Sequence, residues 1–387
     1  MKMRMTQLKT IADIQTGPFG SQLHKEDYVE TGTPIVTVEH LGNRVFTEQN
    51  LPRVSDSDKA RLIKYTLSTG DIVFSRVGSV DRCSYVDKSH DGWMFSGRCL
   101  RVRPTELVDS LYLYYYFCLE ETKQFVRNIA VGATMPSINT KLLGEVEIAL
   151  PDLNNQKRIA AVLSSLDDKI ENNQKLNDNL ADLLQTVYQD RFGNTSLVAN
   201  QGFLSDICSY SRDKVAVSEL NVSTYFSTEN MLPGKAGSTE ATSLPTTSQT
   251  TACHKGDTLI SNIRPYFKKI VYCEDKCGCS TDVLCFTPSQ PCYSAYLFST
   301  LYADKFFAFM VAGSKGTKMP RGDKQQIMTY PVVLPSEEEL AGFNTIASPL
   351  LEQIYSNRAE NKRLSILRNT LLPKLMSGEI DVSDVQL

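Results

Sequence analysis

The chain carries an internal duplication, and this feature limits its fold more than any other. A Gly-x-x-Met-Pro motif begins at Gly132 and recurs 184 residues later at Gly316. Each copy is followed by a Leu-Pro pair and then by an amphipathic run of about 40 residues. A Gly-Asp motif at Gly70 recurs at Gly256. A duplicated sequence predicts a pseudo-two-fold structure, which suits a target with two separate parts.

Length and composition set the broad class. A chain of 387 residues is too long for one compact core, so two or more domains are expected. The net charge of −3 means that any nucleic-acid surface must be a local patch. The most apolar stretch, 111–119, is much shorter than the roughly 20 residues of a membrane span, and the first residues lack the apolar region of a signal peptide. We therefore expect a cytoplasmic protein without a membrane partner, whose ten cysteines are reduced.

Four segments follow from the pattern along the chain. Residues 1–150 and 194–334 contain short β-rich runs between glycine-rich turns, which predicts two mixed domains. Residues 151–193 and 335–387 are predicted to form two long helices, the second with a tail. The predicted fold class is therefore mixed α/β (α+β), with a pseudo-two-fold repeat of two domains separated by two long coiled-coil helices.

Both long runs space their apolar residues in alternating steps of four and three, as in a coiled-coil seam. The pattern extends from Ile159 to Val187 and again from Phe343 to Leu371. Two asparagines interrupt each seam near its middle, and a buried asparagine weakens a seam but fixes its register. These positions are Asn173, Asn177, Asn357 and Asn361.

The asparagines are compatible with two helix arrangements. A parallel pair would match each position with its own repeat. An antiparallel pair would place Asn173 opposite Asn361 and Asn177 opposite Asn357, and pseudo-two-fold symmetry favours it. The alternative is that each helix packs only on its own domain and exposes its asparagines to water.

Local signals mark the helix ends. Ser336 to Glu339 is typical of a capping box, Gly193 follows the first run, and Pro373 is expected to kink or end the second.

Each helix would be about 60 Å long at 1.5 Å per residue. Helices of that length can hold two DNA-binding domains on separated half-sites of duplex DNA, since one turn of the duplex measures about 34 Å. They can equally serve as a scaffold for two protein partners.

The ordered motifs resemble a known family over nearly the whole chain. The first half carries Gly17-Pro-Phe-Gly20 and a Gln-Lys-Arg-Ile run that ends at Ile159. The second carries Asn262-Ile-Arg264-Pro-Tyr266, and the C-terminus carries Leu371-Leu-Pro-Lys-Leu-Met-Ser-Gly-Glu-Ile. Together with the duplication, these closely resemble the specificity (S) subunit of type I restriction-modification enzymes.

The resemblance implies a non-catalytic protein. It implies two target recognition domains that read a bipartite, asymmetric site in double-stranded DNA, and two antiparallel helices that set the spacer. Two methyltransferase (M) subunits would bind the helices and the adjoining surfaces, and restriction (R) subunits would join the complex. No cofactor is expected in this chain, because S-adenosylmethionine, ATP and Mg²⁺ belong to the partner subunits. The second half departs from the pattern with Glu337-Glu-Glu-Leu340 where the first has the more typical run, which puts the second partner contact in doubt.

Searches for catalytic motifs in the sequence agree with a non-catalytic role. A methyltransferase glycine loop, an Asn/Asp-Pro-Pro-aromatic motif and a P-loop are all missing from the sequence, and four histidines suggest no triad. One loose nuclease pattern combines Asp152 with Asp167 and Lys169. The two later residues lie in the middle of a predicted helix, so a solvated helix face is the favoured interpretation.

Two further patterns concern a possible metal site and a tripeptide motif. Cys273-x3-Cys277-x-Cys279, with Cys285 and Cys292 nearby, could ligate zinc, although the spacing is not that of a ribbon or knuckle. Free thiols in a small β-rich core are favoured, so no metal ligand is predicted. The tripeptide Arg321-Gly-Asp323 is a chance match to an adhesion motif.

The candidate DNA contacts are polar, basic and glycine residues in predicted loops, because base edges and phosphates are bound by such side chains and by backbone N–H groups. Glycine also allows a close approach of the backbone to a ligand. The structural alternative is that these residues cap turns or lie on solvated faces. The rival function is a protein-interaction scaffold or decoy that binds methyltransferase subunits without reading bases. The candidates are Phe19, Gly20, Ser21, Gln22, Arg76, Gly78, Arg82, Thr134 and Met135 in the first domain, and Asn262, Arg264, Tyr266, Lys268, Lys269, Lys315, Lys318 and Arg321 in the second.

Overall fold

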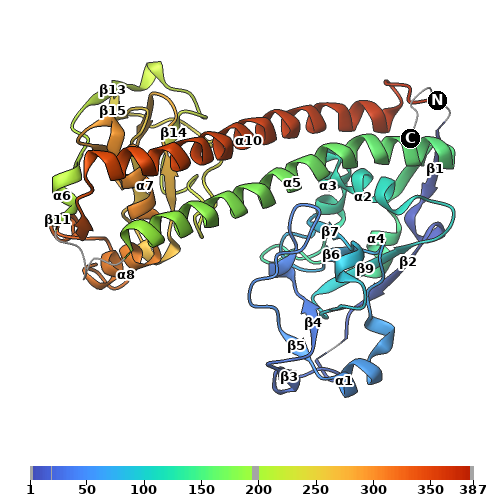
Figure 1. The fold of residues 1–387 in the computed structure, drawn as a ribbon. Coiled ribbons are helices and arrows are strands. Elements are labelled where there is room, and N and C mark those ends of the chain that lie inside the picture. The colour runs from blue at the N-terminus through green and yellow to red at the C-terminus, as the bar shows by residue number, and fades with distance from the viewer. Residues whose placement is uncertain (1–2, 19, 194–199, 384–387) are drawn as a thin grey trace. The chain divides into compact units, whose positions relative to one another are not determined.

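The fold was analysed in a computed structural model, which describes residues 3–18, 20–193 and 200–383. Residues 194–199 of the predicted second domain and 384–387 of the predicted tail lie outside the described residues. The chain divides into two compact units (Figure 1). Unit 1 comprises Met1–Glu171 and Asn361–Leu387, and unit 2 comprises Asn172–Glu360. Each unit therefore contains one part of each long helix.

Unit 1 contains three small sheets. The central one has the strand order β2-β9-β6-β7 and is antiparallel throughout, a second has the order β3-β5-β4-β8, and β1 pairs with β10. The strands are β1 (Arg4–Gln7), β2 (Ala12–Thr16), β3 (Tyr28–Val29), β4 (Thr33–Val36), β5 (Arg53–Val54), β6 (Ile72–Ser75), β7 (Cys83–Tyr85), β8 (Met94–Phe95), β9 (Cys99–Pro104) and β10 (Glu147–Leu150).

Unit 2 repeats this design. Its central sheet has the order β12-β19-β16-β17, its second sheet the order β13-β15-β18-β14, and β11 pairs with β20. The parallel pair β4–β8 of unit 1 has its counterpart in the parallel pair β14–β18. The strands are β11 (Gln201–Phe203), β12 (Cys208–Tyr210), β13 (Lys214–Ala216), β14 (Tyr225–Phe226), β15 (Gln249–Cys253), β16 (Thr258–Ser261), β17 (Ile270–Tyr272), β18 (Cys277–Cys279), β19 (Val283–Pro288) and β20 (Pro331–Val333).

Short helices pack against both central sheets. The apolar run 111–119 forms most of α2, whose Tyr112 and Tyr115 are fully buried, and its counterpart in unit 2 is α7 with the buried Tyr296. The phenol of Tyr112 donates to the carbonyl of Ala149, and that of Tyr296 to Val333, both at 2.6 Å. The short helices are α1 (Asp56–Arg61), α2 (Ser110–Cys118), α3 (Glu120–Ile129), α4 (Thr140–Gly144), α6 (Leu204–Ile207), α7 (Ser294–Tyr302), α8 (Asp304–Ala312) and α9 (Lys324–Met328).

The two long helices are α5 (Leu153–Phe192) and α10 (Glu337–Ser377). The predicted capping box is confirmed, since the Ser336 hydroxyl accepts from the Glu339 N–H at 3.2 Å and the Glu339 carboxylate accepts from the Ser336 N–H at 2.8 Å. Of the two outcomes predicted for Pro373, a kink or an end of the second run, the structure excludes the end. Helix α10 continues to Ser377, because Leu375 and Met376 are buried in the unit 1 core and hold the last turn.

Within each unit the two long helices pair antiparallel, which confirms the predicted fold class. In unit 2 the Asn357 amide donates to Asn177 Oδ1 at 2.9 Å, and Asn173 donates to Glu360 at 2.7 Å. In unit 1 the Asn361 amide donates to the carbonyl of Ile170 at 3.2 Å. Asn173, Asn177 and Asn357 are buried. The hydrogen bond between Asn357 and Asn177 and that from Asn173 to Glu360 satisfy part of the polar groups that replace apolar residues in this seam.

One pair of facing residues in the seam between the long helices differs between the units. In unit 1, Arg368 forms an ion pair with the buried Asp167 at 2.5 Å, and Asp167 also accepts from the Tyr115 hydroxyl at 2.7 Å. A shift of 184 residues takes Asp167 to Leu351 and Leu184 to Arg368. Unit 2 therefore has two buried leucines where unit 1 has an ion pair.

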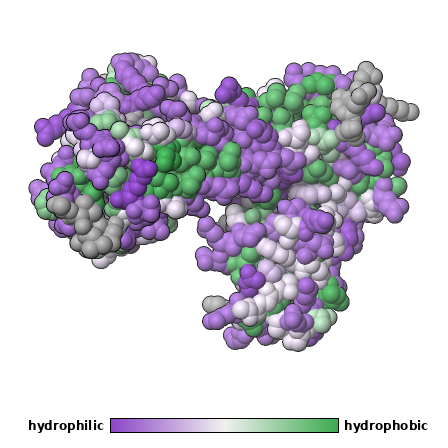
Figure 2. All heavy atoms as spheres, viewed as in Figure 1, coloured by the Kyte–Doolittle hydropathy of each residue, from purple (hydrophilic) through white to green (hydrophobic). Residues whose placement is uncertain are grey.

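The long helices also expose apolar side chains at equivalent positions. Leu183 of unit 2 is 48% exposed and Leu367 of unit 1 is 45% exposed, and the same 184-residue shift relates them. Figure 2 shows a hydrophobic area over the C-terminal part of α10, where Ile366 is also exposed.

Candidate nucleic-acid interface

Two loops that are far apart in the sequence lie together in unit 1. Loop 76–82 follows β6, and loop 131–138 follows α3. The Gly78 N–H donates to the carbonyl of Pro136 at 2.8 Å, and the Ile138 N–H donates to that of Arg76 at 2.9 Å. The loop that carries the predicted candidates Arg76 and Gly78 is thus joined to the loop that carries Thr134 and Met135.

Unit 2 builds the same arrangement from loops 262–269 and 315–322. The Arg264 N–H donates to the carbonyl of Pro320 at 2.8 Å, and the Gly322 N–H donates to that of Asn262 at 3.2 Å. These bonds are the counterparts of those in unit 1. We call the two loops in each unit its paired loops. In both units they bring together candidate residues that are more than 40 positions apart in the sequence.

A glycine shapes the second loop of each pair. Gly132 has a φ of 105° and Gly316 a φ of 101°, values that residues with a side chain rarely adopt. Two reciprocal backbone hydrogen bonds close each loop, between Val131 and Ser137 in unit 1 and between Lys315 and Arg321 in unit 2. The loops expose Met135 by 59% and its counterpart Met319 by 50%. Met319 was not among the predicted contacts, although the repeat motif could have indicated it.

The basic candidates differ in how far acidic neighbours neutralise them. Lys315 pairs with Asp323 at 2.6 Å, and Arg321 pairs with Asp282 at 3.0 Å. Lys318 and Arg264 are exposed, and neither has an ion pair within the described part of the chain. Among the basic candidates of unit 2, these two are therefore the most available to a polyanion.

Three candidates of unit 2 are held by the fold. Asn262 is only 8% exposed, so the expectation of an exposed side chain is wrong for it, because its backbone joins both paired loops. Its Oδ1 atom is buried without a hydrogen-bond partner. The Lys269 ammonium donates to the carbonyl of Thr228 at 2.5 Å, and burial lowers its pKa. Tyr266 is half exposed and packs on Phe267 at the tip of its loop.

An acidic clamp holds the base of loop 262–269. Asp304 at the start of α8 pairs with Lys268 at 2.9 Å and with Lys235 at 2.8 Å. Lys268 has a φ of 51° and Lys235 a φ of 65°, so each lysine lies at a tight turn of the backbone. Lys235 was not predicted from the sequence, since nothing local to it points to Asp304.

The clamp leads to a pH-dependent expectation. Hydrogen bonds from Lys235 and Lys268 lower the pKa of Asp304. A lowered folded-state pKa stabilises the fold above the unfolded value of about 3.9, and the contribution is lost as pH falls through the folded pKa. Because Asp304 is well exposed, Asp304→Asn should cost only about 0.5–1 kcal/mol at pH 7. Urea unfolding at pH 7 and near pH 3 measures this. A difference between variant and wild type that stays the same in acid would contradict the expectation.

The candidates near residue 20 lie apart from the paired loops in sequence. Phe19 lies outside the described residues. Gly20 and Ser21 are exposed, whereas the Gln22 amide oxygen accepts from the Tyr65 hydroxyl at 2.7 Å and is partly used by the fold. The preceding Gly17 packs on the backbone of Ser96, where a Cβ atom would lie 2.2 Å from the carbonyl oxygen.

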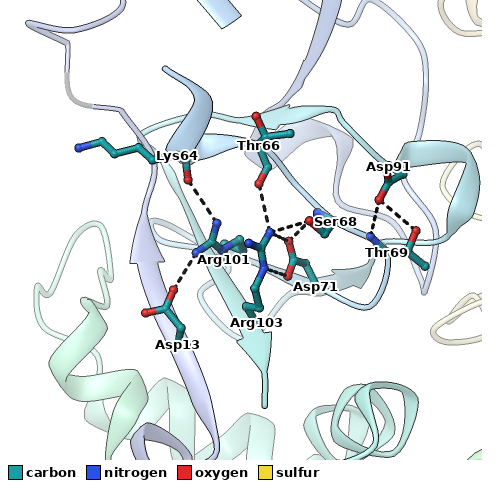
Figure 3. Close-up of polar contacts among 9 residues, drawn as sticks. All are labelled: Asp13, Lys64, Thr66, Ser68, Thr69, Asp71, Asp91, Arg101 and Arg103. Carbon is teal, nitrogen blue, oxygen red and sulfur yellow. Dashed lines mark hydrogen bonds and ion pairs between the residues drawn. The ribbon is translucent and has the colours of Figure 1, made fainter. Parts of the chain in front are cut away.

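Two arginines of β9 support the sheet next to this region in unit 1 (Figure 3). Arg101 is buried and pairs with Asp13 at 2.7 Å, and its guanidinium also donates to the carbonyl of Lys64. Arg103 binds the buried Asp71 through two hydrogen bonds of 2.7 Å, which raise the pKa of its guanidinium. Sequence reasoning missed this network, because both arginines alternate with apolar residues in an ordinary strand pattern.

The structure removes the nuclease interpretation. Asp152 accepts from the N–H of Asn155 at 3.0 Å and caps α5. Asp167 lies 15 residues further along, about 22 Å away in an α-helix, and is engaged by Tyr115 and Arg368. The three residues of the loose pattern therefore do not form one metal site.

Comparison with known proteins points to one family. The sequence profile described as "Type I restriction modification DNA specificity domain" matches residues 2–181. The type I restriction enzyme MjaIX specificity subunit of Methanocaldococcus jannaschii is 25% identical over 309 residues, which are 73% of this chain and 72% of the relative. Residues 2–181 thus match the specificity domain of type I restriction-modification systems, and the relatives similar to this chain are specificity subunits of such systems.

Further similarities agree with this assignment. The HindI specificity subunit of Haemophilus influenzae is 26% identical over 133 residues, covering 33% of this chain and 29% of the relative. The crystal structure of a type I restriction-modification system S subunit from M. genitalium superposes with a TM-score of 0.62 at 18% identity, over 97% of this chain and 96% of that one. This last similarity shows the fold.

Two further findings concern catalysis and membrane insertion. Specificity subunits are the non-catalytic DNA-recognition components of type I systems, which explains why the sequence offers no catalytic motif. Among the described residues, no helix has both the length and the apolar character to cross a membrane.

Proposed function

We propose that this protein is the subunit that selects a bipartite DNA sequence for a type I restriction-modification complex. In this proposal residues 1–150 and 194–334 are the two target recognition domains, and each reads one half-site. The observation that carries the proposal is the set of paired loops, built by equivalent backbone hydrogen bonds in both units but bearing different side chains. One framework with different contact residues suits two half-sites of different sequence.

The long helices complete the proposed function. They would set the number of base pairs between the half-sites and bind two methyltransferase subunits, with restriction subunits joining the complex in the cytoplasm. The equivalent exposed leucines, Leu183 and Leu367, support two copies of one partner, because each copy could contact the same helix surface. S-adenosylmethionine, ATP and Mg²⁺ would then be bound by the partner subunits.

Adenine-methylation mapping tests this proposal. A host that expresses this chain with its methyltransferase subunit should methylate one split motif on both strands, and the motif should stay unmethylated when this chain is omitted. A stable complex with the methyltransferase that produces no new methylated motif would refute base reading. That outcome would favour the scaffold or decoy function.

A further inference from the structure

Five of the ten cysteines meet in one small core of unit 2. They come from the end of β15, from both ends of β18, from the middle of β19 and from the residue after β17. All five are buried. They are Cys253, Cys273, Cys277, Cys279 and Cys285. The sequence had suggested four of them, but not Cys253, which lies 20 residues before Cys273.

Three of these thiols have the spacing of metal ligands. The sulfur atoms of Cys253, Cys273 and Cys277 all lie within 4.8 Å of one another, and those of Cys273 and Cys277 are 3.5 Å apart. In a tetrahedral zinc site with Zn–S bonds of about 2.3 Å, ligand sulfurs are about 3.8 Å apart. The three sulfurs can therefore reach one ion after side-chain shifts of less than about 1 Å.

Cys285 is the candidate for a fourth ligand. The Cys253 thiol interacts with that of Cys285, and Cys285 Sγ lies 3.2 Å from the buried carboxylate of Asp257. Cys285 thus neighbours Cys253 and belongs to the same buried core, although its sulfur lies outside the group of three that are all within 4.8 Å of one another. The loop between Cys273 and Cys277 has three residues, within the usual range for a pair of zinc ligands.

The duplication shows that the fold itself does not require thiols here. The N–H of Val86 donates to the carbonyl of Asp71, as that of Cys273 does to Asp257, which makes Val86 the counterpart of Cys273. By the same comparison of strand pairing, Leu67 and Trp93 occupy the places of Cys253 and Cys277. Unit 1 fills this position with an apolar core.

The replacement leaves unit 2 with less apolar bulk. A tryptophan, a leucine and a valine give way to three small, soft, polarizable side chains gathered at one point. An ion that binds them would replace the lost packing by direct bonds between β15, the end of β17 and the start of β18.

We propose that unit 2 binds one Zn²⁺ ion through Cys253, Cys273 and Cys277, with Cys285 as the fourth ligand. On binding, each thiol loses its proton to solvent and its sulfur forms a bond to the metal, so no oxidant or reductant is needed. The closed set of four sulfurs gives the site a structural role, since no position remains for a substrate. The ion would brace the base of the hairpin that carries loop 262–269.

Metal analysis of the full-length chain tests the proposal. The protein is purified without a metal-binding tag under reducing conditions, incubated with Zn²⁺ and passed over a desalting column, and its zinc content is measured by plasma mass spectrometry. The expected result is about one zinc per chain, falling at least about fivefold in Cys277→Ala and in Cys253→Ala. Cys208→Ala, a buried thiol of unit 2 outside the cluster, and Cys292→Ala, an exposed one, should keep the ion.

A second measurement covers the case in which the cluster variants fail to fold. Wild-type protein loaded with Co²⁺ should show the intense visible and near-ultraviolet absorption of tetrahedral cobalt–thiolate coordination, and Zn²⁺ should displace it. Wild-type protein that holds no zinc after desalting, or Co²⁺ bound without thiolate absorption, overturns the proposal. So does a loss of zinc in Cys208→Ala or Cys292→Ala as large as in Cys277→Ala.

Discussion

Replacement of Asp167 by alanine is expected to lower the free energy of unfolding of unit 1 by about 3 kcal/mol. Asp167 is buried, and its carboxylate accepts from the Tyr115 hydroxyl and pairs with Arg368. Without it, a guanidinium that is only 28% exposed loses its counter-charge and a buried phenol loses its acceptor. Urea unfolding followed by the fluorescence of Trp93 measures the effect in unit 1, because the chain has a single tryptophan.

A neighbouring carboxylate and the equivalent leucines of unit 2 supply two matched controls. Asp168→Ala removes a neighbouring carboxylate that pairs with Arg44 but is 54% exposed, so the expected cost is below about 1 kcal/mol. The double variant Asp167→Leu with Arg368→Leu copies the leucine pair of unit 2 and should restore stability to within about 1 kcal/mol of wild type. An equal cost for Asp167→Ala and Asp168→Ala, or a double variant as unstable as the single one, would contradict this account of the seam.

The second large effect concerns sequence selection. Given the proposed function, Arg264→Ala should reduce discrimination at one base pair of the second half-site by about 1–3 kcal/mol, roughly 5- to 150-fold. Arg264 is exposed and its backbone is fixed to Pro320, so under the proposed function its guanidinium would be free to bind a base edge. The first half-site should be unchanged, because unit 1 has its own paired loops. Methylation mapping of the variant measures both half-sites together.

Two variants separate base reading from charge. Arg264→Lys keeps the charge but loses the two-pronged hydrogen bond, so it should relax the same base as Arg264→Ala. Lys318→Ala removes an exposed cation and should weaken binding to all sequences alike, with a salt slope shallower by about one unit. If Arg264→Ala instead weakened every sequence equally, Arg264 would be a phosphate contact and not a base reader.

The repeat, the helices and the start of α10 could be predicted because they depend on neighbours in the sequence, whereas the end of α10 could not, because it depends on burial of its last turn. The alternating steps of three and four set which face of α5 is buried, and the capping box at Ser336 involves residues three positions apart. The loop candidates came from residue type and turn signals. Most lie exposed, but Asn262 does not, because its burial depends on a loop about 60 residues away.

Tertiary structure alone decided the contacts that cross between strands and helices. No local pattern joins Asp167 to Arg368, Asp71 to Arg103 or Cys253 to Cys277, because strand order and helix pairing bring them together. The duplicated sequence by itself determined that one framework would be built twice. Which buried positions hold an ion pair, a leucine pair or a group of thiols emerged only from packing, since a buried charge or thiol is defined by the partners that surround it.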